Sequence, residues 1–158
     1  MGVLMTWEDW NKVQYFTPNE NWGDWTKLEK NVIFLLDRMR GEIGRSIIIH
    51  CAYEAGGHST QSQHYLGRAV DCHIKNTPLL EQYLLAERYG WSGIGLYTDW
   101  NNPGLHLDLR RESDDYDDLT LYKGARWGRK KIWQAGGMKT VYVALDQEFI
   151  KHIINGGY

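Results

Sequence analysis

Two short stretches with a strict alternation of apolar and polar residues constrain the fold of this chain most. The segments AVDCHI at 69–74 and LHLDL at 105–109 repeat with a period of two, which is the period of a strand. Each predicted strand therefore has an apolar face for the core and a polar face with one histidine and one aspartate. The residues on the polar faces are Asp71 and His73 in the first segment and His106 and Asp108 in the second.

The rest of the chain predicts an α+β fold. Because 158 residues suffice for one hydrophobic core, we expect one domain over 1–158, with helices packed on a small antiparallel sheet. The segment 24–41 is a predicted helix, since Asp24 can cap its start and Gly41 can supply a left-handed stop. The segment 105–109 belongs to an expected strand 105–111. Other expected strands are 46–53, 91–98 and 139–145, and other expected helices are 7–10, 78–90 and 146–156.

Charge argues against a nucleic-acid partner. The chain has 18 basic and 20 acidic residues, so its formal net charge of -2 gives no field that would attract DNA or anionic lipid. An acidic run at 112–118 precedes a basic run at 123–131. The basic run could be a surface patch that binds nucleic acid. The favoured interpretation is two solvated runs that partly neutralise each other.

The sequence predicts neither a membrane span nor a signal peptide. No stretch approaches the roughly 18 apolar residues of a span, and the first residues lack a basic region and an apolar segment. We therefore expect synthesis in the cytoplasm. The two cysteines, Cys51 and Cys72, fit no CxxC motif and are expected to be reduced thiols.

A histidine close to the first predicted strand suggests a metal site. On a straight helix the seven residues from His64 to Asp71 would rise about 10 Å, too far for both to reach one ion. The chain must turn between them, and Gly67 is placed to allow it. Two imidazoles and a carboxylate suit Zn²⁺ and leave a fourth position for water, which is the layout of a catalytic site.

Two motifs resemble those of a known family. SQHYLGRAVD at 62–71 matches SxHxxGxAxD, and HLD at 106–108 matches HxD, of the zinc D-alanyl-D-alanine carboxypeptidases. That superfamily includes peptidoglycan endopeptidases, phage endolysins and the hedgehog signalling domain. The resemblance covers roughly residues 15–128 and leaves 129–158 as an extension.

The resemblance implies a hedgehog-like or metallopeptidase-like fold and a role for five residues. His64, Asp71 and His106 would be the zinc ligands, and Ser62 and Tyr97 would bind substrate. The implied reaction is hydrolysis of an amide bond in peptidoglycan stem peptides, by a carboxypeptidase or an endolysin-type endopeptidase. Such an enzyme without an export signal could be released to the wall as a phage or prophage lysin.

The general base of many relatives has no counterpart here. It stands two or three residues before the last histidine, where this chain has Gly104 and Pro103. Asp108, on the same predicted strand face as His106, is the best replacement, and Asp99 is the second choice. Asp108 could equally be a partner that only orients the imidazole.

A cation of the family is also missing. Relatives usually end the buried strand with Ser-Gly-Tyr-Arg, whereas this chain has CAYE at 51–54, so Arg68 or Arg45 would have to compensate. These departures leave a second hypothesis, a catalytically silent, zinc-stabilised module that binds the cell wall or a protein. Its ligand contacts would come from the 8 Trp and 10 Tyr side chains.

Overall fold

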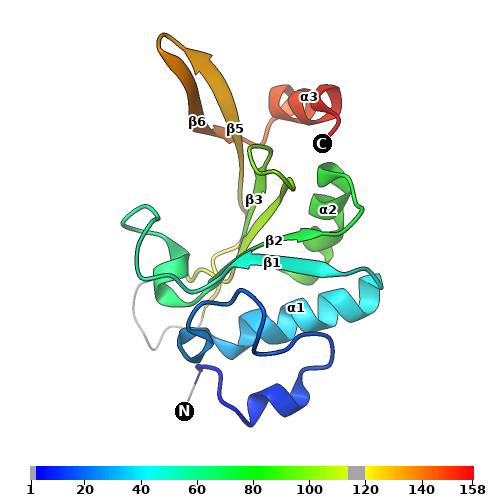
Figure 1. Ribbon diagram of the computed structural model, residues 1–158, viewed down its shortest axis with the longest axis vertical. Coiled ribbons are helices and arrows are strands. Elements are labelled where there is room, and N and C mark those ends of the chain that lie inside the picture. The colour runs from blue at the N-terminus through cyan, green and yellow to red at the C-terminus, as the bar shows by residue number, and fades with distance from the viewer. Residues whose placement is uncertain (1–2, 114–119) are drawn as a thin grey trace.

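The computed structural model describes residues 3–113 and 120–158 as an α+β fold with one six-stranded sheet (Figure 1). Most of the acidic run at 112–118 therefore lies outside the described residues. The strands are β1 (Ile47–Cys51), β2 (Ala69–Ile74), β3 (Gly93–Tyr97), β4 (Gly104–Asp108), β5 (Ala125–Gln134) and β6 (Gly137–Ala144). The helices are α1 (Lys30–Ile43), α2 (Leu79–Ala86) and α3 (Gln147–Gly156), with 3₁₀ turns η1 (Asp9–Lys12), η2 (Trp25–Lys27), η3 (Gln63–Leu66) and η4 (Glu87–Tyr89).

The sheet is mixed, which corrects the prediction of an antiparallel sheet. The strand order is β1-β2-β4-β3-β5-β6, and every pairing is antiparallel except that between β3 and β5. β4 ends where β3 and β5 begin, since Asp108 and Ala125 are both register partners of Gly93, so β5 runs in the direction of β3. The prediction missed this pairing because β5, with its basic residues, was not recognised as a strand.

The apolar faces of the strands and helices form one core, as the alternation predicts. Val70 and Cys72 of β2 and Leu105 and Leu107 of β4 are buried in the same cluster as the apolar residues of α1 and α2. In Figure 1, α1 runs along one side of β1 and β2. The polar faces of β2 and β4 consequently look away from these helices.

Helix α1 corrects the predicted bounds of 24–41. Asp24 caps only the short turn η2, and α1 continues through Gly41 to Gly44, which has the left-handed φ of 72°. Gly41 does not end the helix but lies under the Tyr15 ring, since a Cβ there would lie 2.4 Å from a ring carbon. Within the described ranges, the helices are too short or too polar to traverse a bilayer.

The chain turns between His64 and Asp71 at Gly67, as predicted. Gly67 follows η3 with a φ of 69° and directs the chain into β2. It also touches the segment before α1, because its carbonyl oxygen accepts the Glu29 N–H at 2.8 Å. A Cβ on Gly67 would lie 1.9 Å from the Lys27 carbonyl oxygen. The motif glycine therefore supplies both a left-handed turn and a close backbone contact.

We expect Gly67→Ala to destabilise the protein more than Gly44→Ala. Both glycines have similar left-handed φ values, so both variants pay the backbone strain of about 1–2 kcal/mol. A Cβ at Gly44 meets nothing within 4 Å, whereas one at Gly67 collides with backbone. The collision should lower the free energy of unfolding by a further 1–3 kcal/mol or so, measured by chemical denaturation. Equal losses for the two variants would contradict this packing role.

Candidate metal centre

His64 is held in place by the backbone of another segment. Its Nδ1 lies 2.6 Å from the Ala52 carbonyl oxygen, which can only accept a hydrogen bond, so Nδ1 carries the proton. In the neutral ring, Nε2 then presents its lone pair, and this atom lies 3.2 Å from Asp71 Oδ1. The ring is therefore fixed in the tautomer that a metal ligand needs.

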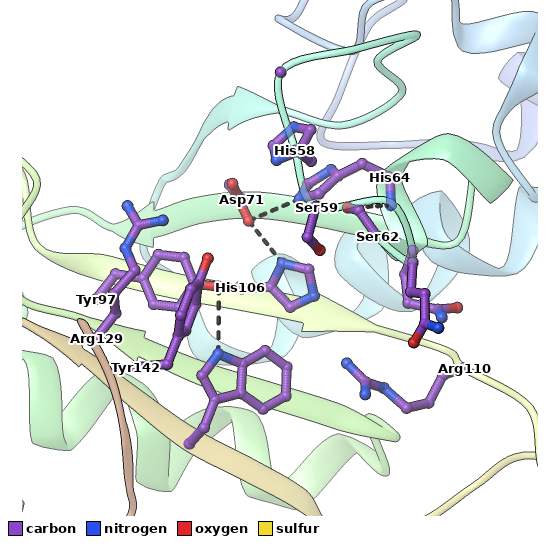
Figure 2. A pocket seen from close by; sticks show the side chains of 14 residues that line it. His58, Ser59, Ser62, His64, Asp71, Tyr97, His106, Arg110, Arg129 and Tyr142 are labelled. Carbon is purple, nitrogen blue, oxygen red and sulfur yellow. Dashed lines mark hydrogen bonds and ion pairs between the residues drawn. The ribbon is translucent and has the colours of Figure 1, made fainter. Parts of the chain in front are cut away.

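Asp71 and His106 face each other across neighbouring strands. They are register partners in the antiparallel pair of β2 and β4, and His106 Nδ1 lies 3.0 Å from Asp71 Oδ1. One carboxylate oxygen thus meets both imidazoles, as Figure 2 shows. Burial raises the pKa of Asp71, but the hydrogen bond from His106 and the close contact with His64 outweigh it and hold the pKa well below its usual range.

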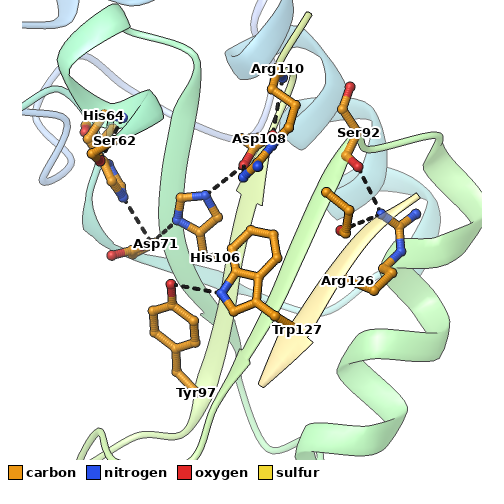
Figure 3. A network of polar contacts seen from close by, with 12 residues as sticks. Ser62, His64, Asp71, Ser92, Tyr97, His106, Asp108, Arg110, Arg126 and Trp127 are labelled. Atoms are coloured by element: carbon orange, nitrogen blue, oxygen red, sulfur yellow. Dashed lines mark hydrogen bonds and ion pairs between the residues drawn. The ribbon is translucent and has the colours of Figure 1, made fainter. Parts of the chain in front are cut away.

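Asp108 lies behind His106 and holds the far side of its ring. Its Oδ2 is 2.8 Å from His106 Nε2, and its two oxygens also accept hydrogen bonds from Arg110 (Figure 3). Burial lowers the pKa of His106, yet the bonds to Asp108 and Asp71 raise it to about 9. Without a metal the ring therefore donates from both nitrogens, and a cation at Nδ1 must displace that proton. The geometry favours Asp108 as the partner that orients His106.

His64, Asp71 and His106 together form a candidate metal centre. All three side chains are buried, and their ligand atoms lie within 4.8 Å of one another, close enough to hold one metal ion. The fit is supported by the donor atoms themselves: Nε2 of His64, Nδ1 of His106 and a carboxylate oxygen converge on one point. Two nitrogens and one oxygen are a common ligand set for catalytic zinc.

A second group of possible ligands overlaps the first. Cys51 Sγ, one ring nitrogen of His58 and one ring nitrogen of His64 lie within 4.8 Å of one another. Burial raises the pKa of the Cys51 thiol, and the neighbouring Asp71 and Glu54 raise it further, so the thiolate that binds metals or attacks carbonyls is disfavoured. Both groups need His64, and the one with Asp71 and His106 needs no deprotonated thiol.

The candidate centre forms part of the wall of a cavity of about 460 Å³ (Figure 2). Ser62 and Tyr97, the predicted substrate-binding residues, also line this cavity. The sequence interpretation missed several further lining residues, among them Arg110, Trp127, Arg129 and Tyr142.

The period of two could have identified Arg110. It continues the series of His106 and Asp108 within the expected strand 105–111, but only His106 and Asp108 of that face were assigned to the site. Trp127 and Arg129 could not be found in this way, because the strand that carries them was not predicted. Tyr142 lies on a predicted strand, but nothing in the sequence assigned its face to the site.

The other predicted site residues lie elsewhere. Arg68 is buried in an ion pair with Glu29, at 2.9 Å, and does not line the cavity. Arg45 pairs with Glu81. Asp99 accepts two hydrogen bonds from Arg129 and lines a neighbouring pocket, which it shares with Asp71.

Comparisons with known proteins add no relatives. No protein-family model matches the chain, and searches of curated proteins and of solved structures find no significant match. The resemblance to the zinc carboxypeptidases therefore rests on the two motifs. Three residues of those motifs form the candidate centre.

We expect His106→Ala to abolish tight metal binding and Cys51→Ala to preserve it. Removal of an outer partner typically lowers metal affinity 10–100-fold, so loss of a ligand should cost more than about 100-fold. The measurement is calorimetric titration of the metal-free protein with Zn²⁺. His58→Ala is the second control, since it tests the other histidine of the overlapping group. Retention of affinity in His106→Ala with loss in Cys51→Ala would place the ion in that group.

Proposed function

We propose that this protein is a zinc-dependent peptidase that hydrolyses an amide bond in peptidoglycan stem peptides. The observation that carries the proposal is the convergence of His64, Asp71 and His106 at the wall of an open cavity. A structural metal site would fill all its positions with protein ligands. Three donors beside a cavity leave room for water and a substrate carbonyl.

Zinc would be held by these three side chains, and when bound it supplies a Lewis acid that acidifies water and polarises a carbonyl. The protein fixes the geometry of the ligands. The Ala52 carbonyl oxygen holds His64, and Asp108 holds His106, so neither imidazole is free to rotate.

Arg110 supplies the cation that the segment 51–54 lacks. Its guanidinium binds Asp108 through Nε and Nη2, at 2.9 and 2.6 Å, and lies over the Trp127 ring, 5.0 Å from its centroid. A guanidinium has five N–H donors, so this pairing leaves others free to face the cavity. In our proposal they bind a carbonyl or carboxylate oxygen of the substrate.

Tyr97 and Ser62 add hydrogen-bond donors of the proposed substrate site. Burial raises the pKa of Tyr97, so its phenol stays protonated. The Tyr97 oxygen already accepts a bond from Trp127 Nε1 at 3.3 Å, which leaves its proton for a ligand. The Ser62 oxygen accepts the His64 N–H at 3.2 Å and can likewise donate into the cavity.

A catalytically silent wall-binding module remains the second candidate, and one observation favours it. Among the described residues that line the cavity, Asp71 is the sole carboxylate, and it is a proposed ligand. No second acid therefore faces the cavity to exchange protons with water. Wall binding without turnover by the zinc-loaded protein would support this module.

We expect the purified protein to release amines from peptidoglycan or from short stem peptides in a zinc-dependent manner. A chelator should abolish release and added Zn²⁺ should restore it, because the metal supplies the Lewis acid. New amino groups are quantified by chemical labelling, and mass spectrometry identifies the bond. Absence of chelator-sensitive release from both kinds of substrate would contradict the proposal.

The variant Asp108→Asn separates an orienting role from that of a general base. If Asp108 orients His106, zinc affinity should fall about 10–100-fold while kcat at saturating zinc stays within about tenfold of the parent value. Loss of a general base would instead lower kcat by about 10²–10⁴ even at saturating zinc. The matched control is Asp99→Asn, and thermal unfolding of both variants shows whether the fold is intact. If Asp108→Asn, but not Asp99→Asn, lowers kcat by about 10²–10⁴ at saturating zinc, the orienting role of Asp108 is wrong.

A further inference from the structure

The hairpin of β5 and β6 extends beyond the rest of the sheet. β5 pairs with β3 only over residues 125–129, whereas its pairing with β6 continues to Gln134 and Gly137. The outer half of the hairpin therefore has no neighbour in the sheet, and it projects as an arm in Figure 1.

The two faces of this arm have different surroundings. Odd-numbered residues 127–133 and even-numbered residues 138–144 share one face, because register partners point to the same side. The opposite face meets α3 at its base: a Cβ on Gly128 would lie 2.2 Å from the Phe149 ring. The first face, termed the open face, exposes Trp133, Met138 and Tyr142 by 75%, 59% and 64%.

The open face is continuous with the cavity. Trp127, Arg129 and Tyr142 line the cavity, and all three belong to this face. Figure 2 shows Arg129 and Tyr142 beside Tyr97 at the cavity wall. At about 3.4 Å per residue, the open face extends some 20 Å from Trp127 to Trp133. A ligand longer than the cavity would leave it along this strand.

The charge of the arm favours a ligand with carboxylates. Residues 125–144 include five bases and no acid, although the whole chain has a formal net charge of -2. Two of the five, Arg126 and Arg129, pair with Glu87 and Asp99, and the other three are lysines. On the open face of β5, cations stand between rings, in the order Trp127, Arg129, Lys131, Trp133. Indole rings stack on the apolar faces of sugars and amides, and the bases pair with carboxylates.

We propose that the open face is a docking track for the polymeric wall strand whose stem peptide enters the cavity. This inference rests on the proposed function and names its substrate as the assembled polymer rather than a free peptide. A membrane or nucleic acid fits less well, because the rings and bases follow one face from the cavity outward. A lipid surface would contact only the tip of the arm and would not reach the cavity.

The test compares variants on the two faces of the arm. Lys131→Ala and Trp133→Ala change the open face, whereas Lys130→Ala and Lys139→Ala remove the same charge from the opposite face. Binding is measured by co-sedimentation with insoluble peptidoglycan, and kcat/KM is measured on that wall and on a short stem peptide. We expect the open-face variants to weaken wall binding about tenfold and to lower the ratio of wall to peptide kcat/KM similarly. The opposite-face variants should bind like the parent.

Three outcomes would overturn the track. These are equal loss from both faces, unchanged wall binding in the double variant Lys131→Ala with Trp133→Ala, and tighter binding to anionic vesicles or single-stranded nucleic acid than to the wall. Failure of the proposed function gives a different result, in which no substrate is cleaved. Wall binding that still depends on the open face would then support the track for the silent module.

Discussion

One carboxylate oxygen that meets two imidazoles is the contact on which the rest of the site depends. A buried carboxylate is costly unless it is paired, so Asp71 requires the partners that β4 and η3 bring to it. The register of β2 with β4 places His106 opposite, and the turn at Gly67 returns the chain so that His64 reaches the same oxygen. The candidate site is thus the place where the buried polar side chains of the sheet find their hydrogen-bond partners.

The sequence predicted those parts of the fold that depend on local periodicity. The alternation in 69–74 and 105–109 assigned the core faces of β2 and β4, and the turn at Gly67 followed from the spacing of two candidate ligands. Parts that depend on distant partners could not be predicted. A glycine such as Gly41 is typical of a helix end, so the sequence predicted a stop there. In the structure the helix continues, and the Tyr15 ring occupies the space that a Cβ at Gly41 would need.

The charged residues show the same limit. Arg68 lies inside the first motif, yet its partner Glu29 is 39 residues away, and no sequence pattern links the two residues. β5 was missed because its bases resemble a solvated run, although Arg126 pairs with Glu87 and Arg129 with Asp99. Of these two side chains interpreted as surface charge, Arg129 thus forms part of the cavity wall and Arg126 links β5 to η4.

The two carboxylates that contact the His106 ring have a consequence for how an ion would bind. In the metal-free state a proton on each ring nitrogen lets the imidazole bridge Asp71 and Asp108, so a proton balances the buried charge that a cation would otherwise balance. In our proposal, a cation at Nδ1 of His106 displaces one of these protons, so zinc binding competes with protonation of the ring.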